Sequence, residues 1–121
     1  MKRALCLVAL ALAAACDCDE SIQYAIQLTM VDSISGEPVV AEITAVASDG
    51  SFSDGVTYTA EQAEAFDAEM SFARERAGTY QVEVTADGYQ PWVMTGVNVM
   101  ADECHVETVQ LMARLQPIPA G

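Results

Sequence analysis

Apolar and polar residues alternate with a period of two through much of the chain after residue 22. The clearest runs are residues 26–30, 80–86, 97–99 and 109–113. Successive side chains of a β-strand point to opposite faces, so this period places one face on a core and the other in water. The pattern therefore predicts a chain built mainly from strands.

Residues that favour chain reversal separate these runs. They are Gly, Asp, Ser and Pro, and they occur at 33–38, Asp49-Gly50, Asp54-Gly55, Ala77-Gly78 and Asp87-Gly88. Short strands separated by such turns are typical of an all-β sandwich. We therefore expect one β-sandwich domain at residues 23–116, followed by a flexible tail at 117–121. Its core would draw large rings from Phe72, Tyr80, Tyr89 and Trp92.

The segment 59–76 fits two structures. Thr59 and Gln62 have the spacing of a helix capping box, and residues 60–65 include good helix formers. Beyond them, a strand-like alternation places apolar side chains at Phe66, Ala68, Met70 and Phe72. We predict a short helix near 60–65 followed by a strand, with an unbroken helix through residue 76 as the alternative.

Two segments carry the motifs of a known domain family. Residues 31–39, VDSISGEPV, resemble the opening motif of carboxypeptidase regulatory-like domains. Residues 77–89, AGTYQVEVTADGY, resemble the G-x-Y-x-V-x-V-x-A-x-G-Y strand and turn of that family. The resemblance covers roughly residues 27–111, although the segment 52–76 is longer than the short hairpin that the family has there.

This resemblance implies a prealbumin-like Greek-key sandwich of about seven strands, related to transthyretin. Domains of this family are non-catalytic appendages of peptidases, outer-membrane receptors and surface proteins. The resemblance therefore implies a structural or protein-interaction module and not an enzyme.

The N-terminal residues have the layout of an export signal. Lys2 and Arg3 precede an apolar run at 4–15, which ends in small residues before Cys16. A membrane-spanning helix needs about 20 apolar residues, so this run is too short to be one. The stretch 12–16, LAAAC, resembles the lipobox of bacterial lipoproteins, in which the signal is cut before the cysteine and the cysteine is acylated.

The lipobox resemblance implies a signal peptide at 1–15, lipid on Cys16 and a lipid-anchored tether at 16–22. The protein would then belong to the bacterial cell envelope, facing either the periplasm or the outside. Ala13-Ala14-Ala15 also fits an ordinary A-x-A cleavage site, which would release a secreted protein.

The cysteine count bears on this choice. Cys6 leaves with the signal, so ordinary secretion leaves three cysteines, an odd number for an exported protein. Lipid on Cys16 leaves Cys18 and Cys104 as a pair. Because disulfides form in oxidising compartments, we predict a disulfide between these two residues.

The chain is strongly acidic. Its formal charge of −13 becomes −15 once Lys2 and Arg3 are removed with the signal. A surface of this charge repels nucleic acids and anionic lipid headgroups, and it favours solubility. We therefore expect no nucleic-acid partner. The membrane would be contacted through the lipid anchor, and the partner would be another envelope or surface protein.

The residues offer little evidence of catalysis. His105 is the only histidine and follows Cys104, but neighbouring strand residues point to opposite faces, which argues against a catalytic Cys–His pair. A zinc site made from these two residues with Cys16 and Cys18 would have suitable ligand types, but it would need Cys16 unmodified. We predict no catalytic residue, no cofactor and no bound metal.

An extracellular ligand-binding module, for a glycan or calcium, is the alternative function. The acidic segment 49–55 looks like a calcium loop, but an EF-hand loop starting at Asp49 would need Gly and Glu where Asp54 and Ala60 stand. We therefore interpret it as a hairpin loop. The candidate rings for stacking on a sugar are Tyr58, Tyr89 and Trp92.

Overall fold

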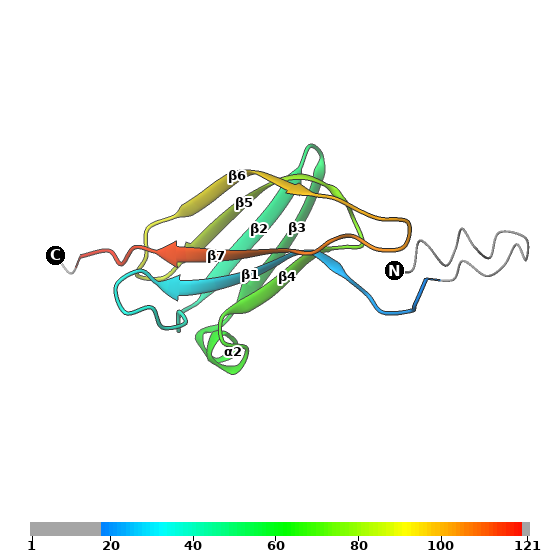
Figure 1. Ribbon diagram of the computed structural model, residues 1–121. Coiled ribbons are helices and arrows are strands. Elements are labelled where there is room, and N and C mark those ends of the chain that lie inside the picture. The colour runs from blue at the N-terminus through cyan, green and yellow to red at the C-terminus, as the bar shows by residue number, and fades with distance from the viewer. Residues whose placement is uncertain (1–17, 120–121) are drawn as a thin grey trace, which may run out of the picture.

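A computed structural model describes residues 18–119 as two β-sheets packed face to face (Figure 1). The elements, in chain order, are β1 (Tyr24–Asp32), β2 (Ile43–Asp49), β3 (Phe52–Tyr58), α2 (Ala60–Ala65), β4 (Glu69–Arg74), β5 (Gly78–Ala86), β6 (Trp92–Val99) and β7 (Val109–Leu115). One sheet has the order β4-β1-β7 and the other has the order β3-β2-β5-β6. The all-β sandwich of about seven strands with one short helix is therefore confirmed.

The strand order makes this sandwich a Greek key. Only β2–β3 and β5–β6 are hairpins of consecutive strands within one sheet, and the chain changes sheets after β1, β3, β4 and β6. Strand β1 pairs antiparallel with β4 and parallel with β7, while β2 pairs antiparallel with both β3 and β5. Long-range pairing of this kind brings the two ends of the chain into one sheet.

The alternating runs supply the core, as their period predicts. The buried side chains of β1 and β5 include Ile26, Leu28, Met30, Val82 and Val84. Phe72 and Tyr80 are almost completely buried, whereas Tyr89 and Trp92 are partly buried and pack against the core. The large rings therefore contribute to the core to different degrees.

The capping box at the start of α2 is confirmed. The Thr59 hydroxyl accepts a hydrogen bond from the backbone N–H of Gln62 at 3.1 Å, and the side-chain oxygen of Gln62 accepts one from the Thr59 N–H at 2.9 Å. The helix ends at Ala65, so the alternative of a continuous helix through residue 76 is wrong.

The strand that follows α2 begins later than the alternation predicts. Phe66 is the C-cap of the helix, and its side chain is 55% exposed. Asp67 and Ala68 both have φ of +54°, a left-handed conformation that turns the chain toward β4. Ala68, Met70 and Phe72 are all buried, as expected. Met70 and Phe72 follow the period of two of β4, which begins at Glu69, whereas Ala68 is buried from the turn before it.

The prediction of a turn at Asp54-Gly55 is also wrong. Gly50 and Ser51 alone close the β2–β3 hairpin, and Gly55 lies within β3 opposite Val46. The Asp54 carboxylate instead accepts a hydrogen bond from the backbone N–H of Ala73 at 2.8 Å. It thereby joins β3 and β4, which are edge strands of different sheets.

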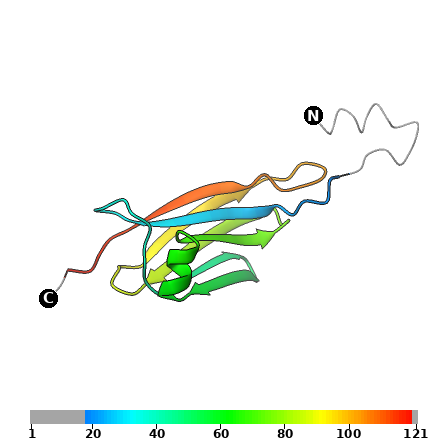
Figure 2. The same ribbon diagram turned by 90° about the horizontal axis from the view of Figure 1, so that it is seen from below.

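The sandwich has two distinct ends (Figures 1 and 2). The proximal end carries the N-terminal segment 18–23 and the β6–β7 loop at 100–108. The distal end carries the β1–β2 loop, the β5–β6 turn and the chain after β7. Pro117 and Ile118, which the sequence assigns to a flexible tail, pair there with the β5–β6 turn.

Candidate functional site

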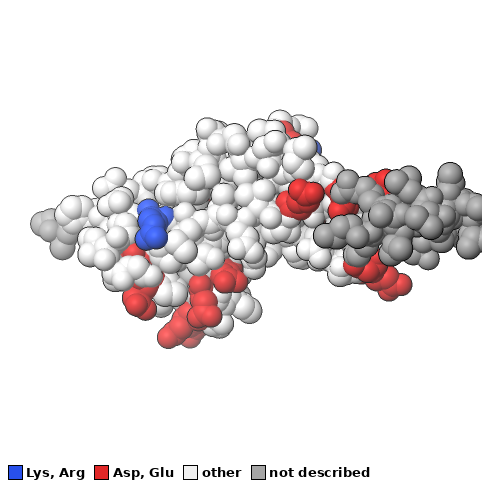
Figure 3. Space-filling model, viewed as in Figure 1, with Lys and Arg blue, Asp and Glu red and all other residues white. Residues whose placement is uncertain are grey.

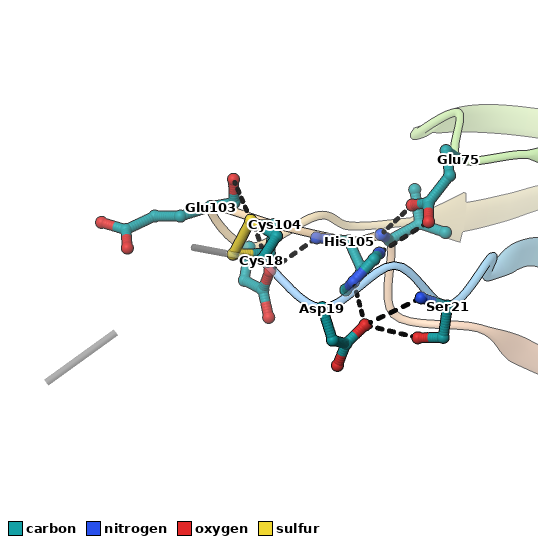
Figure 4. Close-up of a disulfide and its surroundings, with 9 residues drawn as sticks. Cys18, Asp19, Ser21, Glu75, Glu103, Cys104 and His105 are labelled. Atoms are coloured by element: carbon teal, nitrogen blue, oxygen red, sulfur yellow. Dashed lines mark hydrogen bonds and ion pairs between the residues drawn. A yellow bond between two sulfur atoms is a disulfide. The ribbon is translucent and has the colours of Figure 1, made fainter. Parts of the chain in front are cut away.

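A disulfide at the proximal end joins the N-terminal segment to the β6–β7 loop (Figure 4). It links Cys18 to Cys104 across 86 residues of sequence, with 5.2 Å between the two Cα atoms. The predicted pairing is therefore present. Disulfides persist in oxidising compartments, so this bond fits an exported protein. The proposed lipid site, Cys16, and the signal peptide lie outside the described residues.

Cys104 and His105 lie in a loop and not on a strand, which corrects the sequence interpretation. The Asp102 carboxylate accepts hydrogen bonds from the backbone N–H groups of Cys104 at 2.8 Å and His105 at 2.9 Å. This local turn sets the direction of both side chains. Because Cys104 is bonded to Cys18, neither sulfur is available here as a nucleophile or as a thiolate ligand of zinc.

The imidazole of His105 lies between two carboxylates (Figure 4). Its Nε2 is 2.8 Å from Oδ1 of Asp19, and its Nδ1 is 2.6 Å from Oε2 of Glu75. A neutral imidazole carries a proton on only one nitrogen, so hydrogen bonds to both carboxylates require the imidazolium. The hydrogen bond to Glu75, followed by that to Asp19, raises the pKa of His105 despite the opposing effect of burial.

Glu75 connects three parts of the chain that are distant in sequence. Its carboxylate accepts hydrogen bonds from the backbone N–H groups of Gln23 at 3.0 Å and Val106 at 3.3 Å, besides its contact with His105. Its own N–H donates to the carbonyl of Gln23 at 2.8 Å. Burial acts to raise the pKa of Glu75, but these hydrogen bonds and the charge of His105 lower it overall.

We call Cys18, Asp19, Glu75, Cys104 and His105 the proximal clasp. They lie beside an open hollow of about 450 Å³ between segment 18–22 and loop 101–106. The two ring nitrogens of His105 face different carboxylates, so the ring and the carboxylates of Asp19 and Glu75 do not converge on one metal-binding point. No group of three or more His, Cys, Asp or Glu side chains within residues 18–119 could hold a metal ion. The clasp joins segment 18–23 to the β6–β7 loop and to Glu75 just after β4 through the disulfide and these hydrogen bonds.

The sequence predicted only part of this clasp. The cysteine count predicts the disulfide, whereas no sequence pattern distinguishes Asp19 and Glu75 from the other acidic residues. Glu75 lies between β4 and β5 with φ of +49°, a conformation that no local pattern predicted. Its partners come from segments that the fold alone brings together.

The acidic segment 49–55 does not gather its carboxylates around a common point. Asp49 forms an ion pair with Arg76, with Oδ2 and Nη1 3.1 Å apart, while Asp54 accepts the hydrogen bond from Ala73. The β2–β3 hairpin is present, but its turn is only Gly50 and Ser51, and residues 52–55 belong to β3. Both acids have structural partners.

The three rings considered for sugar stacking do not form one platform. Tyr58 lies on β3 and Trp92 on β6, at opposite edges of the four-stranded sheet. All three rings are partly buried against the core. The Tyr58 hydroxyl donates to the carbonyl of Glu69 at 2.6 Å, and the Tyr89 hydroxyl donates to the Asp32 carboxylate at 2.8 Å. These contacts are structural.

Acidic side chains dominate the visible charge of the domain. Figure 3 shows them along the lower side of the sandwich and beside the N-terminal segment, with few basic side chains between them. No helix within residues 18–119 is long and apolar enough to cross a membrane.

The clasp predicts a specific pH dependence. The pKa of His105 is raised in the fold from its ordinary value of 6.5, so its protonation stabilises the fold below pH 6.5. That contribution should disappear as the pH rises from 6.5 through the higher pKa of the folded state. We expect the unfolding temperature of the wild type to fall over this window and that of His105→Gln to stay flat there. Parallel curves from scanning calorimetry would contradict the double contact.

Comparison with known proteins does not identify a family. No family model matches the chain, and no curated protein matches it. A solved structure from Bacteroides uniformis, described as a candidate carbohydrate-binding protein, is similar over 76% of this chain at 13% identity, with a TM-score of 0.49. The matched part spans 40% of that protein's chain. A similarity of this size assigns no function.

Proposed function

We propose that the chain is an exported bacterial lipoprotein, anchored through Cys16, with a non-catalytic structural or protein-interaction module as its folded part. The observation that carries this proposal is the disulfide between Cys18 and Cys104. It accounts for the two cysteines that remain when Cys6 is removed and Cys16 is acylated. An unlipidated protein would keep Cys16 as an unpaired thiol outside the cytosol.

The position of the disulfide suits an anchor. Cys16 precedes Cys18 by two residues, which span at most about 7 Å. A lipid on Cys16 would therefore lie close to the proximal end, with little free chain between it and the clasp. The distal end would then face away from the membrane and remain open to a partner, which we propose to be another envelope or surface protein.

The local structure supports the carboxypeptidase regulatory-like assignment within this proposal. Segment 31–39 forms the end of β1 and the turn after it, and segment 77–89 forms β5 and the turn after it. These are the scaffold positions that the motifs imply. The lack of a catalytic role is supported by the clasp, where His105 is held by two carboxylates beside a disulfide.

The anchor is tested by metabolic labelling with a palmitate analogue in the organism that makes the protein. We expect the wild type to be labelled and to sediment with membranes, and we expect Cys16→Ser to lose the label completely. Cys6→Ser is the matched control, because it changes a cysteine within the signal and should keep the label. Label that persists in Cys16→Ser, or an unlabelled wild type, would overturn the anchor.

A further inference from the structure

The distal end is a single hydrogen-bonded unit built from three segments, 32–42, 87–90 and 115–118, which we call the distal tip. The bonds that join them are Ser33 N–H to Leu115 O at 2.9 Å, Gln90 N–H to Gln116 O at 2.8 Å, Ile118 N–H to Gly88 O at 2.8 Å, and Asp87 N–H to Glu42 O at 3.1 Å. The Tyr89 hydroxyl adds its bond to the Asp32 carboxylate. These contacts fix the three segments relative to one another.

Asp32 organises the most prominent loop of the distal tip. Its Oδ1 accepts hydrogen bonds from the backbone N–H groups of Ile34 at 2.8 Å and Ser35 at 2.9 Å. Its carbonyl accepts a hydrogen bond from the Gly36 N–H at 2.8 Å, and its N–H donates one to the Glu37 carbonyl at 2.9 Å. The bond from Ser35, followed by those from Tyr89 and Ile34, lowers the pKa of Asp32 and keeps it charged. Ile34 is therefore presented from a loop that is already ordered.

The distal tip exposes large aliphatic side chains. Ile34 is 82% exposed, Val40 is 58% exposed and Ile118 is 55% exposed. Isolated exposed apolar residues are common, but these three are carried by segments that are hydrogen-bonded together. Because their backbone is already ordered, burying them against a partner would cost little additional conformational entropy.

Acidic residues accompany these aliphatic side chains. The three segments contain Glu37, Glu42 and Asp87, all exposed, and no Lys or Arg. Arg114 is exposed on β7 directly before segment 115–118 and pairs with Val31, so it borders the tip, where the three exposed acids outnumber it. Acids of this kind repel anionic lipid headgroups and a second acidic tip, which disfavours both a membrane and a second copy as occupant.

We propose that the distal tip is a docking surface for a protein whose apolar pocket is bordered by basic residues. Ile34, Val40 and Ile118 would supply the apolar contacts. Glu37, Glu42 and Asp87 would face the basic border. This inference rests on the proposed function only for the orientation of the tip away from the membrane.

The test is photo-crosslinking in cells of the organism that makes the protein. Benzoylphenylalanine replaces Ile34, Ile118 or, as a control, Met100, which is 57% exposed just after β6 and near the proximal end. We expect the two distal probes to label the same protein and the Met100 probe not to label it. Mass spectrometry of the adducts should place the label in apolar peptides flanked by Lys or Arg.

Charge reversal provides the second readout. With the probe at Ile34, Glu37→Lys combined with Asp87→Lys should lower the adduct yield about tenfold or more, because complementary charges favour encounter and the correct register. Glu83→Lys is the matched control, since Glu83 is an exposed acid on β5 outside the distal tip, and it should leave the yield unchanged. An unaltered unfolding temperature and an intact disulfide would show that each variant is folded.

Several results would overturn the docking surface. In the crosslinking experiment, they are no adduct from either distal probe, equal labelling by the Met100 probe, or adducts to lipid or to a second copy of the chain. In the charge-reversal experiment, the contradicting result is an adduct yield that does not change. Failure of the proposed lipid anchor is a separate result, because the anchor is tested by lipid on Cys16. The distal probes report on the distal tip in both the wild type and Cys16→Ser.

Discussion

Replacing Cys18 and Cys104 together with serine should lower the free energy of unfolding by about 3 kcal/mol. Without the bond, the unfolded chain is no longer cross-linked across 86 residues, and loop-closure entropy alone would give about 4–5 kcal/mol. Freedom regained by segment 18–22 in the folded state offsets part of this. The unfolding temperature should fall on the order of 15 °C, measured by scanning calorimetry of the unlipidated protein.

Reductant provides the control for this prediction. The reduced wild type should unfold near the temperature of the double serine variant, and reductant should leave that variant unchanged. A variant as stable as the wild type would show that the bond does not stabilise the sandwich. The disulfide would then only hold segment 18–22 against the β6–β7 loop.

Phe72→Ala should cost about 4 kcal/mol of unfolding free energy, within the range of large-to-small substitutions of buried rings. Phe72 is fully buried on β4, where it pairs with Ile26 of β1. Its loss would leave a cavity between the two sheets that the neighbouring strands cannot fill. Urea unfolding monitored by circular dichroism measures the change.

Phe66→Ala is the matched control, because it removes the same ring six residues earlier. That ring is 55% exposed and contacts Tyr58 with 5.5 Å between the ring centroids. We expect a loss of about 1 kcal/mol or less. Equal losses at the two positions would contradict the finding that Phe66 lies outside the core.

The strands and the helix could be predicted because their signals are local. The period of two in β1 and β5 reports which face is buried, and the Thr59–Gln62 capping box marks the start of α2. The strand order within segment 52–76 could not be resolved in this way. The chain path of this segment depends on left-handed conformations at Asp67 and Ala68, which are not glycine and carry no turn motif.

The candidate site also has one part that could be predicted from the sequence and one part that could not. Counting cysteines identified the Cys18–Cys104 pair, because parity is a property of the whole sequence and needs no geometry. The contacts of His105 could not be found from sequence. Its partners Asp19 and Glu75 are 86 and 30 residues away, and the acidic chain offers many equivalent carboxylates. Only the pairing of β1 with β4 and β7 brings these residues to one end.

Mass spectrometry of the mature, non-reduced protein from its own cells tests the central claim most directly, because it examines the anchor and the bridge in one molecule. We expect an N-terminal peptide that starts at lipid-modified Cys16 and is joined through Cys18 to the peptide containing Cys104. An N-terminal peptide without lipid, or free thiols at Cys18 and Cys104, would contradict it.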